Sequence, residues 1–296
     1  MNDFIIETRG LRKIFNGHPA VDGLDLKVPA GSIFGFLGKN GAGKTTTIRL
    51  LLGFLKSGGG EARLFGELVT GPGGGAGLRR RIGFVSESKH VYPYMTVRQM
   101  IRFTRPFFPA WRDDLERRYL EVFDLPPNRK VSALSKGMRA GLMLLLGISH
   151  GAELLILDEP TEGLDPAVTD VVLRELVALP ASEGTTIFFS SHQLADVEQI
   201  ADRVAIIDRG RMVVSGALDD LKVQYQRLRV VFQQEPAPVS WVDGAEHVRQ
   251  VGRTVSILAN RNVEALVQQA RSLPGASVER YPVSLKEIFL EHVRSN

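Results

Sequence analysis

Cysteine is absent from this chain of 296 residues. Its absence excludes disulfide frameworks, iron–sulfur clusters, thiol nucleophiles and zinc sites built on cysteine. A chain without cysteine is compatible with the reducing cytosol.

Long uninterrupted apolar runs are also missing. The start, Met1-Asn2-Asp3, lacks the basic segment and apolar stretch of a secretory signal. The longest apolar neighbourhood, residues 141–157, is interrupted by Ser149, His150 and Glu153, and it falls short of the roughly 18 apolar residues that span a bilayer. We therefore expect that no segment crosses a membrane and that the chain stays on the side where it was made.

The chain has only a small excess of positive over negative charge. The formal net charge is +4, and the basic residues are scattered except at Arg79-Arg80-Arg81. With 44% hydrophobic and 24% charged residues, the composition is that of a globular protein. Scattered charge favours a solvated surface, so we expect no specific nucleic-acid partner.

Short apolar runs alternate with helical segments over the first two thirds of the chain. The runs predict strands buried on both faces, at residues 33–37, 154–157, 187–189 and 204–207. The intervening segments predict helices at residues 46–55, 137–149 and 166–179. This alternation predicts an α/β core. The glycine clusters at residues 58–60 and 71–77 are interpreted as flexible surface connections.

Two further regions depart from the alternation. The helical pattern of the segment from about residue 90 to about residue 150 predicts an inserted helical subdomain. Within it, one apolar face is formed by Leu115, Tyr119, Val122 and Phe123. After Leu221 the composition shifts. We therefore expect a first domain of residues 1–221 and a small C-terminal α+β domain of residues 222–296, ending in a helix.

The strongest local signal is Gly38-Lys39-Asn40-Gly41-Ala42-Gly43-Lys44-Thr45, with Thr46 next to it. It follows a predicted buried strand and opens a helix, the context that a P-loop requires. The glycines let backbone N–H groups turn towards phosphate oxygens. Lys44 supplies positive charge and the Thr45 hydroxyl can ligate Mg²⁺. The sequence therefore predicts a P-loop NTPase core.

Two carboxylates follow the buried strand at residues 154–157. Asp158 and Glu159 stand at its carboxyl end, where α/β sheets bind ligands. Asp158 would hold the Mg²⁺ shell, and Glu159 could polarise a water for in-line attack on the γ-phosphorus. Alone, such a pair is more often a cap or a solvated turn, so its interpretation depends on Lys44 and Thr45.

Two weaker signals fit the same chemistry. His192 follows the strand around residues 187–189 and could reach the γ-phosphate, although a lone histidine is usually structural. Ser135 and Gly137 open a helix whose N-terminus suits an anion, although a serine at that position is also an ordinary helix cap.

In this order and spacing, the motifs of residues 4–221 resemble the ATP-binding cassette family, the nucleotide-binding subunits of ABC transporters. Residues 38–45 are similar to its Walker A loop, 134–138 to its signature, Asp158 and Glu159 to its Walker B pair, Gly163-Leu164-Asp165 to its D-loop and His192 to its switch histidine. Phe15 lies where that family stacks an aromatic ring on adenine, although a core phenylalanine is an equal alternative.

The resemblance implies a set of roles for these residues. ATP would contact Phe15, Gly38, Lys39, Asn40, Gly41, Ala42, Gly43, Lys44, Thr45, Thr46, Glu87, Ser135, Gly137 and Asp165. Thr45 and Asp158 would hold Mg²⁺, and Glu159 and His192 would be catalytic. The implied partners are a second ATP-binding subunit and an integral membrane permease, with the chain peripheral at the cytoplasmic face of a bacterial membrane.

Two motifs depart from the family pattern. The signature has Lys136 and Met138 where the family has glycine and glutamine, and Glu87 stands at the coupling loop where glutamine is usual. Together with the closing Ser284-Leu285-Lys286-Glu287-Ile288-Phe289, these features look like the ABC-2 type exporter ATPases of bacteria.

Two other classes of protein share part of this pattern. A soluble ABC protein of translation or DNA handling would share the ATP site, but the former carries two cassettes and the latter long heptad coiled coils, and neither is present. A P-loop kinase or GTPase would leave Ser135, Gly137 and His192 unexplained.

Overall fold

The computed structural model describes residues 3–69, 71, 75–87 and 91–294. The chain divides into two compact units, Met1–Ser215 and Gly216–Asn296, and each is described by itself. The predicted boundary followed Leu221. The helix α8 (Leu218–Gln224) belongs to the second unit, where it contacts the final helix α10 (Leu285–Arg294).

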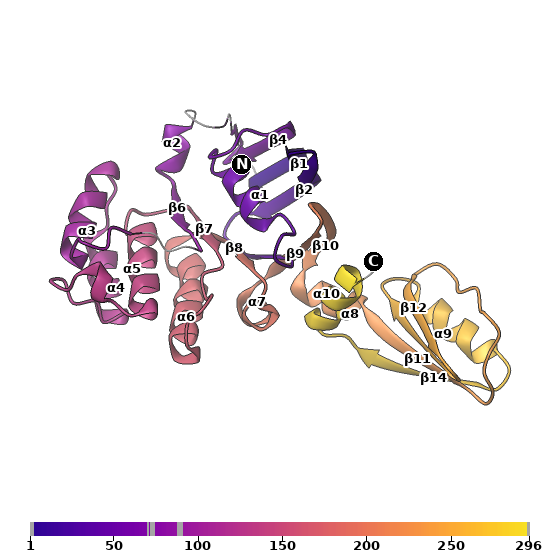
Figure 1. Cartoon of the computed structure of the whole chain (residues 1–296). Coiled ribbons are helices and arrows are strands. Elements are labelled where there is room, and N and C mark those ends of the chain that lie inside the picture. Colours follow the sequence, from indigo (N-terminus) through magenta and orange to yellow (C-terminus); the bar gives the residue numbers. More distant parts are fainter. Residues whose placement is uncertain (1–2, 70, 72–74, 88–90, 295–296) are drawn as a thin grey trace. The chain divides into compact units, whose positions relative to one another are not determined.

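The first unit contains two sheets and a group of helices (Figure 1). Its elements are β1 (Phe4–Phe15), β2 (His18–Pro29), β3 (Ile33–Leu37), α1 (Lys44–Leu51), β4 (Gly59–Leu64), β5 (Glu67–Leu68), α2 (Ala76–Arg79), β6 (Ile82–Val85), α3 (Val97–Thr104), η1 (Arg105–Phe107), α4 (Asp113–Val122), η2 (Val131–Ala133), α5 (Lys136–Ile148), β7 (Leu154–Asp158), α6 (Pro166–Glu183), β8 (Thr186–Ser191), α7 (Leu194–Ile200), β9 (Arg203–Asp208) and β10 (Arg211–Ala217).

The larger sheet confirms the predicted α/β core. Its strand order is β10-β9-β3-β8-β7-β6, and β3 pairs in parallel with β8 and β9, as β7 does with β6 and β8. Every residue of β3, β7 and β8 is buried. Strands covered on both faces need continuous apolar runs, which is why these segments were recognisable in the sequence. Their carboxyl ends lead into Gly38, Glu159 and His192.

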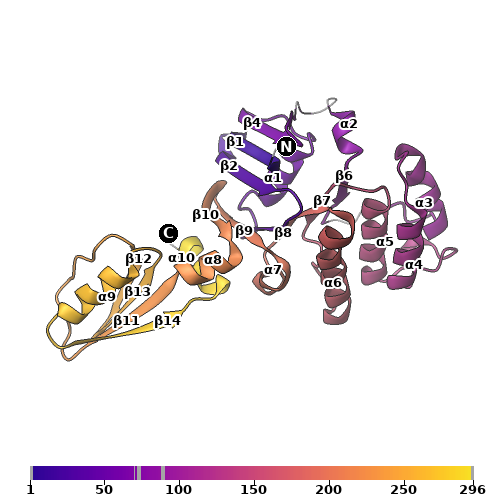
Figure 2. The ribbon, with the colours of Figure 1, turned by 180° about the vertical axis from the view of Figure 1, so that it is seen from behind.

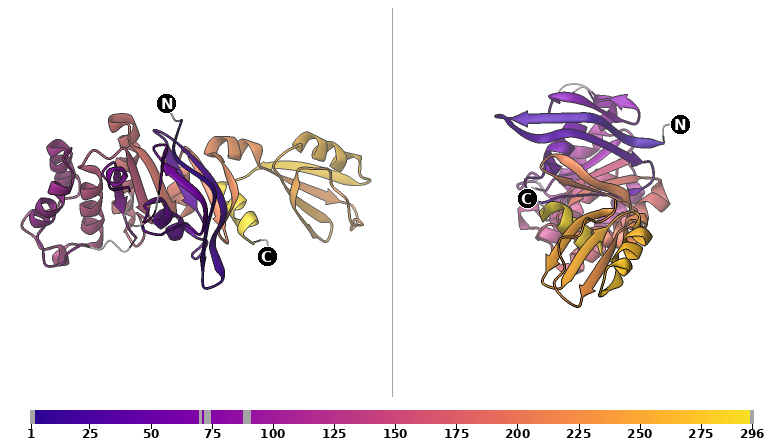
Figure 3. Two further views of the ribbon diagram at one scale, coloured as in Figure 1. Left: turned by 90° about the horizontal axis from the view of Figure 1, so that it is seen from above. Right: turned by 90° about the vertical axis from the view of Figure 1, so that its right-hand side faces the viewer.

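The smaller sheet, ordered β2-β1-β4-β5, was not predicted. The long antiparallel pair of β1 and β2 (Figure 3) buries alternate residues such as Leu24, Leu26 and Val28, so its strands carry no continuous apolar run. The prediction of flexible connections at residues 58–60 was wrong, because Gly59 and Gly60 begin β4.

Position 60 must be glycine because β4 and β1 approach each other closely there. Gly60 has φ of +66°, and a Cβ there would lie 2.1 Å from the carbonyl oxygen of Gly10 on β1. In the second glycine cluster, Gly77 lies within α2, whereas Gly73 and Gly74 fall outside the described residues.

Helices α3, α4 and α5 form the inserted helical region (Figure 1). Of the predicted apolar face, Leu115, Tyr119 and Phe123 are buried and Val122 is half-buried. The Phe123 ring packs over Gly141 of α5, where a Cβ would lie 2.3 Å from it. Among the helices of the described residues, none is both long and apolar enough to span a bilayer.

The second unit is a sheet with helices, as expected for an α+β domain. After α8 come β11 (Gln226–Phe232), β12 (Ala245–Val251), β13 (Thr254–Ala259), α9 (Val263–Ser272), β14 (Ala276–Pro282) and α10. The antiparallel sheet has the order β12-β13-β11-β14, and α9 packs on it (Figure 2). The apolar face of α10 is buried at Leu285, Ile288, Phe289 and Val293.

Candidate functional site

The loop between β3 and α1 has a backbone that only glycine can form. Gly41 and Gly43 have φ of +81° and +111°. A Cβ on Gly43 would lie 2.3 Å from the carbonyl oxygen of Ala20, and one on Gly38 would lie 2.7 Å from that of Ile207. The loop therefore lies tightly against its neighbours. Helix α1 follows with no side-chain cap and no acidic residue in its first turn, which suits an anion.

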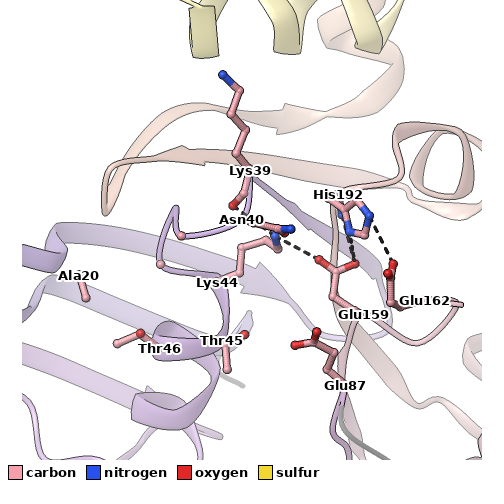
Figure 4. Close-up of a pocket in the computed structure, with 12 residues that line it drawn as sticks. Ala20, Lys39, Asn40, Lys44, Thr45, Thr46, Glu87, Glu159, Glu162 and His192 are labelled. Carbon is pink, nitrogen blue, oxygen red and sulfur yellow. Dashed lines mark hydrogen bonds and ion pairs between the residues drawn. The ribbon is translucent and has the colours of Figure 1, made fainter. Parts of the chain in front are cut away.

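Lys44 is held at the centre of this loop. Its side chain is 6% exposed, and its Nζ donates to the carbonyl oxygen of Gly38 at 2.8 Å. The same Nζ lies 3.1 Å from Oε1 of Glu159, whose side chain is 7% exposed (Figure 4). The lysine charge is thus offset by the carboxylate expected to act in hydrolysis.

The Walker B carboxylates are fixed from the neighbouring strand. The Ser190 hydroxyl donates to Oδ1 of Asp158 at 2.6 Å and accepts from the backbone N–H of Glu159 at 3.1 Å. Glu159 has φ of +50°, so the chain turns sharply as it leaves β7. Ser190 was not predicted as a site residue. It faces Asp158 because β7 and β8 pair in register, which no local motif reveals.

His192 lies between two carboxylates (Figure 4). Its Nδ1 is 2.9 Å from Oε2 of Glu159, to which its backbone N–H also donates at 3.2 Å. Its Nε2 is 3.3 Å from Oε2 of Glu162. Glu162 was also not predicted. A single acidic residue in a loop does not indicate a functional role unless the structure shows the histidine beside it.

These groups surround one cavity of about 350 Å³. It is lined by Ala20, Lys39, Asn40, Gly41, Gly43, Lys44, Thr45, Thr46, Glu87, Glu159, Glu162 and His192. Most of the predicted P-loop residues thus meet Glu87, Glu159 and His192. A buried cation beside free helix N–H groups fits a polyphosphate. The Thr45 hydroxyl and the Asp158 carboxylate are oxygen donors of the kind that Mg²⁺ prefers.

Several predicted contacts do not line this cavity. Ser135 caps α5, its Oγ accepting from the N–H of Met138 at 3.1 Å, and Asp165 caps α6 in the same way. Gly137 is buried against Val168. The Phe15 ring is 43% exposed, with Nζ of Lys13 5.3 Å from its centroid, so its adenine contact stays a prediction.

The fold and this site define a P-loop ATPase. The chain matches the ABC transporter family over residues 21–162. It is 32% identical to the ABC transporter ATP-binding protein YhaQ of Bacillus subtilis over 295 residues, covering 95% of this chain and 96% of that protein. The chain therefore belongs to the ATP-binding proteins of ABC transporters.

Two further relatives are named for their functions. The chain is 40% identical to the daunorubicin/doxorubicin resistance ATP-binding protein DrrA of Streptomyces peucetius, over 73% of this chain and 66% of that protein. It is 32% identical to the Nod factor export ATP-binding protein I of Ralstonia nicotianae, over 97% of this chain and 92% of that protein.

Solved structures agree on the fold. An ATP-binding subunit of an ABC transporter has 27% identity and a TM-score of 0.67, covering 74% of this chain and 92% of its own. A dimeric bacterial ABC transporter cassette has 18% identity and a TM-score of 0.65, covering 72% of this chain and 98% of its own. The family predicted from the motifs is confirmed. The chain is a transporter ATPase, and the soluble alternative is not supported.

Proposed function

We propose that the chain is one of two ATP-binding subunits of an exporter, that the pair closes around two MgATP, and that it drives a separately encoded membrane permease. The observation that carries this proposal is the contact of Lys44 with Glu159 at the cavity beneath the glycine loop. It places the phosphate-binding cation and the carboxylate that acts on water at one cavity, as hydrolysis requires.

The chain's own residues divide the chemistry between them. Lys44 exchanges the Glu159 carboxylate for phosphate oxygens when ATP enters, which releases Glu159 to orient the attacking water. Thr45 and Asp158 would hold Mg²⁺, which would neutralise phosphate charge. His192 is oriented by Glu159 through Nδ1, and its Nε2 donates to the γ-phosphate in place of its contact with Glu162.

We infer the second subunit from signature residues that do not line the ATP cavity of their own chain. Ser135 and Lys136 are exposed at the N-terminus of α5 and do not line the cavity of their own chain. The Ser135 Oγ accepts from Met138, so its O–H remains a donor for another acceptor. A second copy of the chain would bring this serine, and the charge of Lys136, to the γ-phosphate of the first.

The relatives support export. Two of them are named for drug resistance and for Nod factor export. By this likeness we assign the chain to an exporter, as a peripheral subunit at the cytoplasmic face of a bacterial membrane. Affinity purification of the full chain from detergent-solubilised membranes should recover an integral membrane protein that stimulates its ATPase. Recovery without any such protein would contradict the proposal.

An apolar cleft in the first unit is suited to receive the permease. It has a volume of about 250 Å³ and is lined by Leu52, Phe54, Arg79, Ile82, Phe84, Thr104, Phe108, Met143, Leu146, Gly147 and His150. Phe54 is 49% exposed, and burial lowers the pKa of His150 to about 4, so this ring is neutral near pH 7. A largely apolar, open cleft favours a protein partner.

A row of exposed aromatic rings lies at α3 and the segments on either side of it. Tyr92 contacts Tyr94 and Phe103, and Phe103 contacts Phe107, with ring centroids 5.4 to 5.8 Å apart. Tyr94 and Phe107 are 66% and 60% exposed. Exposed aromatic side chains are the residues that protein interfaces enrich, so we assign this row to the permease contact too.

The double variant Phe54→Ser/Phe107→Ser tests this surface. We expect it to reduce recovery of the permease and its stimulation of ATP hydrolysis by about tenfold, while basal ATP affinity stays unchanged because neither residue lines the ATP cavity. The matched control is Val251→Ser, at an apolar residue that is 72% exposed in the second unit. Equal recovery of all three proteins would exclude the surface.

Glu87→Gln tests the departure at the coupling loop. A carboxylate near the γ-phosphate is unfavourable unless a cation offsets it, whereas a glutamine carries no charge. Glu87 lines the cavity with Thr45 and Glu159. We expect the variant to keep its ATP affinity within a few-fold but to change the Mg²⁺ concentration for half-maximal hydrolysis and the stimulation by the permease. If neither quantity moves, Glu87 is only a surface residue.

A further inference from the structure

A group of imidazole and carboxylate side chains lies in the second unit and is not used by the ATP site. Glu246, His247 and His292 each offer a ligand atom, and these atoms all lie within 4.8 Å of one another. Oε2 of Glu246 is 3.0 Å from Nε2 of His292. The rings of His247 and His292 are 5.2 Å apart at an angle of 80°. Three potential metal ligands thus converge on one point.

A β-bulge brings consecutive residues of β12 to this point. Ala245 pairs with Ala259 while His247 pairs with Leu258, so Glu246 is an extra residue in the ladder. Neighbouring side chains of a regular strand point to opposite faces, and a bulge breaks that alternation. Glu246 and His247 can therefore both reach His292 on α10. Bulges are features that re-aim side chains, often beside functional sites.

The ring of His292 is oriented as metal-bound imidazoles are. Its Nδ1–H donates to the carbonyl oxygen of Ile288 at 2.8 Å, which directs Nε2 at Glu246. The side chain is 11% exposed. Metal-binding histidines commonly donate their second ring N–H to a carbonyl or carboxylate, which fixes the tautomer. The side-chain amide of Asn260 in turn donates to Oε1 of Glu246.

The charges of the nearby guanidinium groups are matched by carboxylates. Arg227 lies 3.2 Å from Glu291 and 3.5 Å from Glu287, and Arg249 lies 3.8 Å from Glu291. Glu246 in turn pairs with His292, and a bound cation would take the place of the proton that these two side chains share. A cavity of about 380 Å³, lined in part by Glu246 and His247, gives access to the group.

We propose that Glu246, His247 and His292 form a binding site for a divalent transition metal, with Zn²⁺ the best match. Two imidazoles and one carboxylate are a zinc donor set, whereas Mg²⁺ and Ca²⁺ prefer oxygen ligands alone. Three protein ligands leave a fourth position for water. The ion links β12 to α10 and stabilises the folded unit, because the unfolded chain does not hold these ligands together.

The test is Zn²⁺ titration of the full chain without nucleotide, by calorimetry after removal of metals, with Co²⁺ absorption as a second probe. We expect one ion per chain and an unfolding temperature that rises with Zn²⁺ concentration. Loss of an outer partner of a metal ligand weakens binding by about 10- to 100-fold, so His292→Ala and His247→Gln, which each remove a ligand, should weaken it at least that much.

The controls separate this site from the ATP site, whose Glu159, Glu162 and His192 also converge. His192→Ala and the exposed His18→Ala should leave Zn²⁺ binding unchanged. Glu246→Gln, which keeps the size of the side chain, covers the case in which His292→Ala fails to fold. Absence of Zn²⁺ binding by the native chain, retention of binding by His247→Gln and Glu246→Gln, or its loss in His192→Ala would each overturn the proposal.

Discussion

Glu159→Gln is expected to lower the rate of ATP hydrolysis by about 100-fold or more, the size of effect that general-base groups have, while MgATP affinity stays within a few-fold. Glutamine keeps the size of the side chain and an oxygen facing Lys44. In the native chain, Oε1 of Glu159 lies 3.1 Å from Nζ of Lys44. It removes the charge that orients the attacking water, an interaction that matters in the transition state rather than in binding. Binding and hydrolysis should therefore separate.

The same variant should accumulate a closed dimer in the presence of MgATP. Light scattering on a size-exclusion column measures this directly, and the dimer should be absent without nucleotide. Glu162→Gln is the matched control, since Glu162 contacts His192, whereas Glu159 contacts both His192 and Lys44. Its rate should fall far less. Hydrolysis by Glu159→Gln at the native rate would show that the Walker B assignment is wrong.

Lys44→Ala should abolish tight ATP binding, lowering the affinity by about 100-fold or more, because a buried charge-assisted contact with phosphate is lost. The substitution also leaves the carboxylate of Glu159, 7% exposed, without its lysine partner. Breaking a buried ion pair in this way costs about 3–5 kcal/mol of stability. Denaturant unfolding should therefore register the change even in the absence of ATP.

The double variant Lys44→Ala/Glu159→Gln distinguishes these two effects. Removing the second charge should recover part of the lost stability but none of the ATP affinity, since the cation is still missing. Fluorescent nucleotide titration and unfolding curves on the four proteins give both quantities. Native-like ATP affinity in either protein that lacks Lys44 would remove the lysine from the phosphate site.

The parts of the fold that the sequence predicted are those with local signals. Buried parallel strands need continuous apolar runs, and the phosphate loop needs its glycines, so β3, β7 and the loop before α1 were recognisable. The antiparallel pair of β1 and β2 was missed because it carries no continuous apolar run and because buried and exposed residues do not alternate regularly along β1. Its burial is set by partners far along the chain.

The site shows the same division. Lys44, Asp158 and Glu159 belong to motifs, whereas Ser190 and Glu162 act through contacts made only after folding. Ser190 reaches Asp158 by strand register, and Glu162 reaches His192 across a loop. Glycines 59 and 60 were misinterpreted because glycine allows both a flexible loop and a close strand crossing, and only the position of Gly10 decides between them.

Two copies of this chain are proposed to complete each ATP site, and a cross-link between the copies reports that arrangement most directly. The chain has no cysteine, so an Asn40→Cys protein and a Ser135→Cys protein, both carrying Glu159→Gln, each have a single thiol. Asn40 lines the cavity and Ser135 does not. When the two proteins are mixed with a short thiol cross-linker, MgATP should produce a covalent dimer, and neither protein alone should match its yield. ATP binding by both proteins without any MgATP-dependent cross-link in the mixture would contradict the shared site.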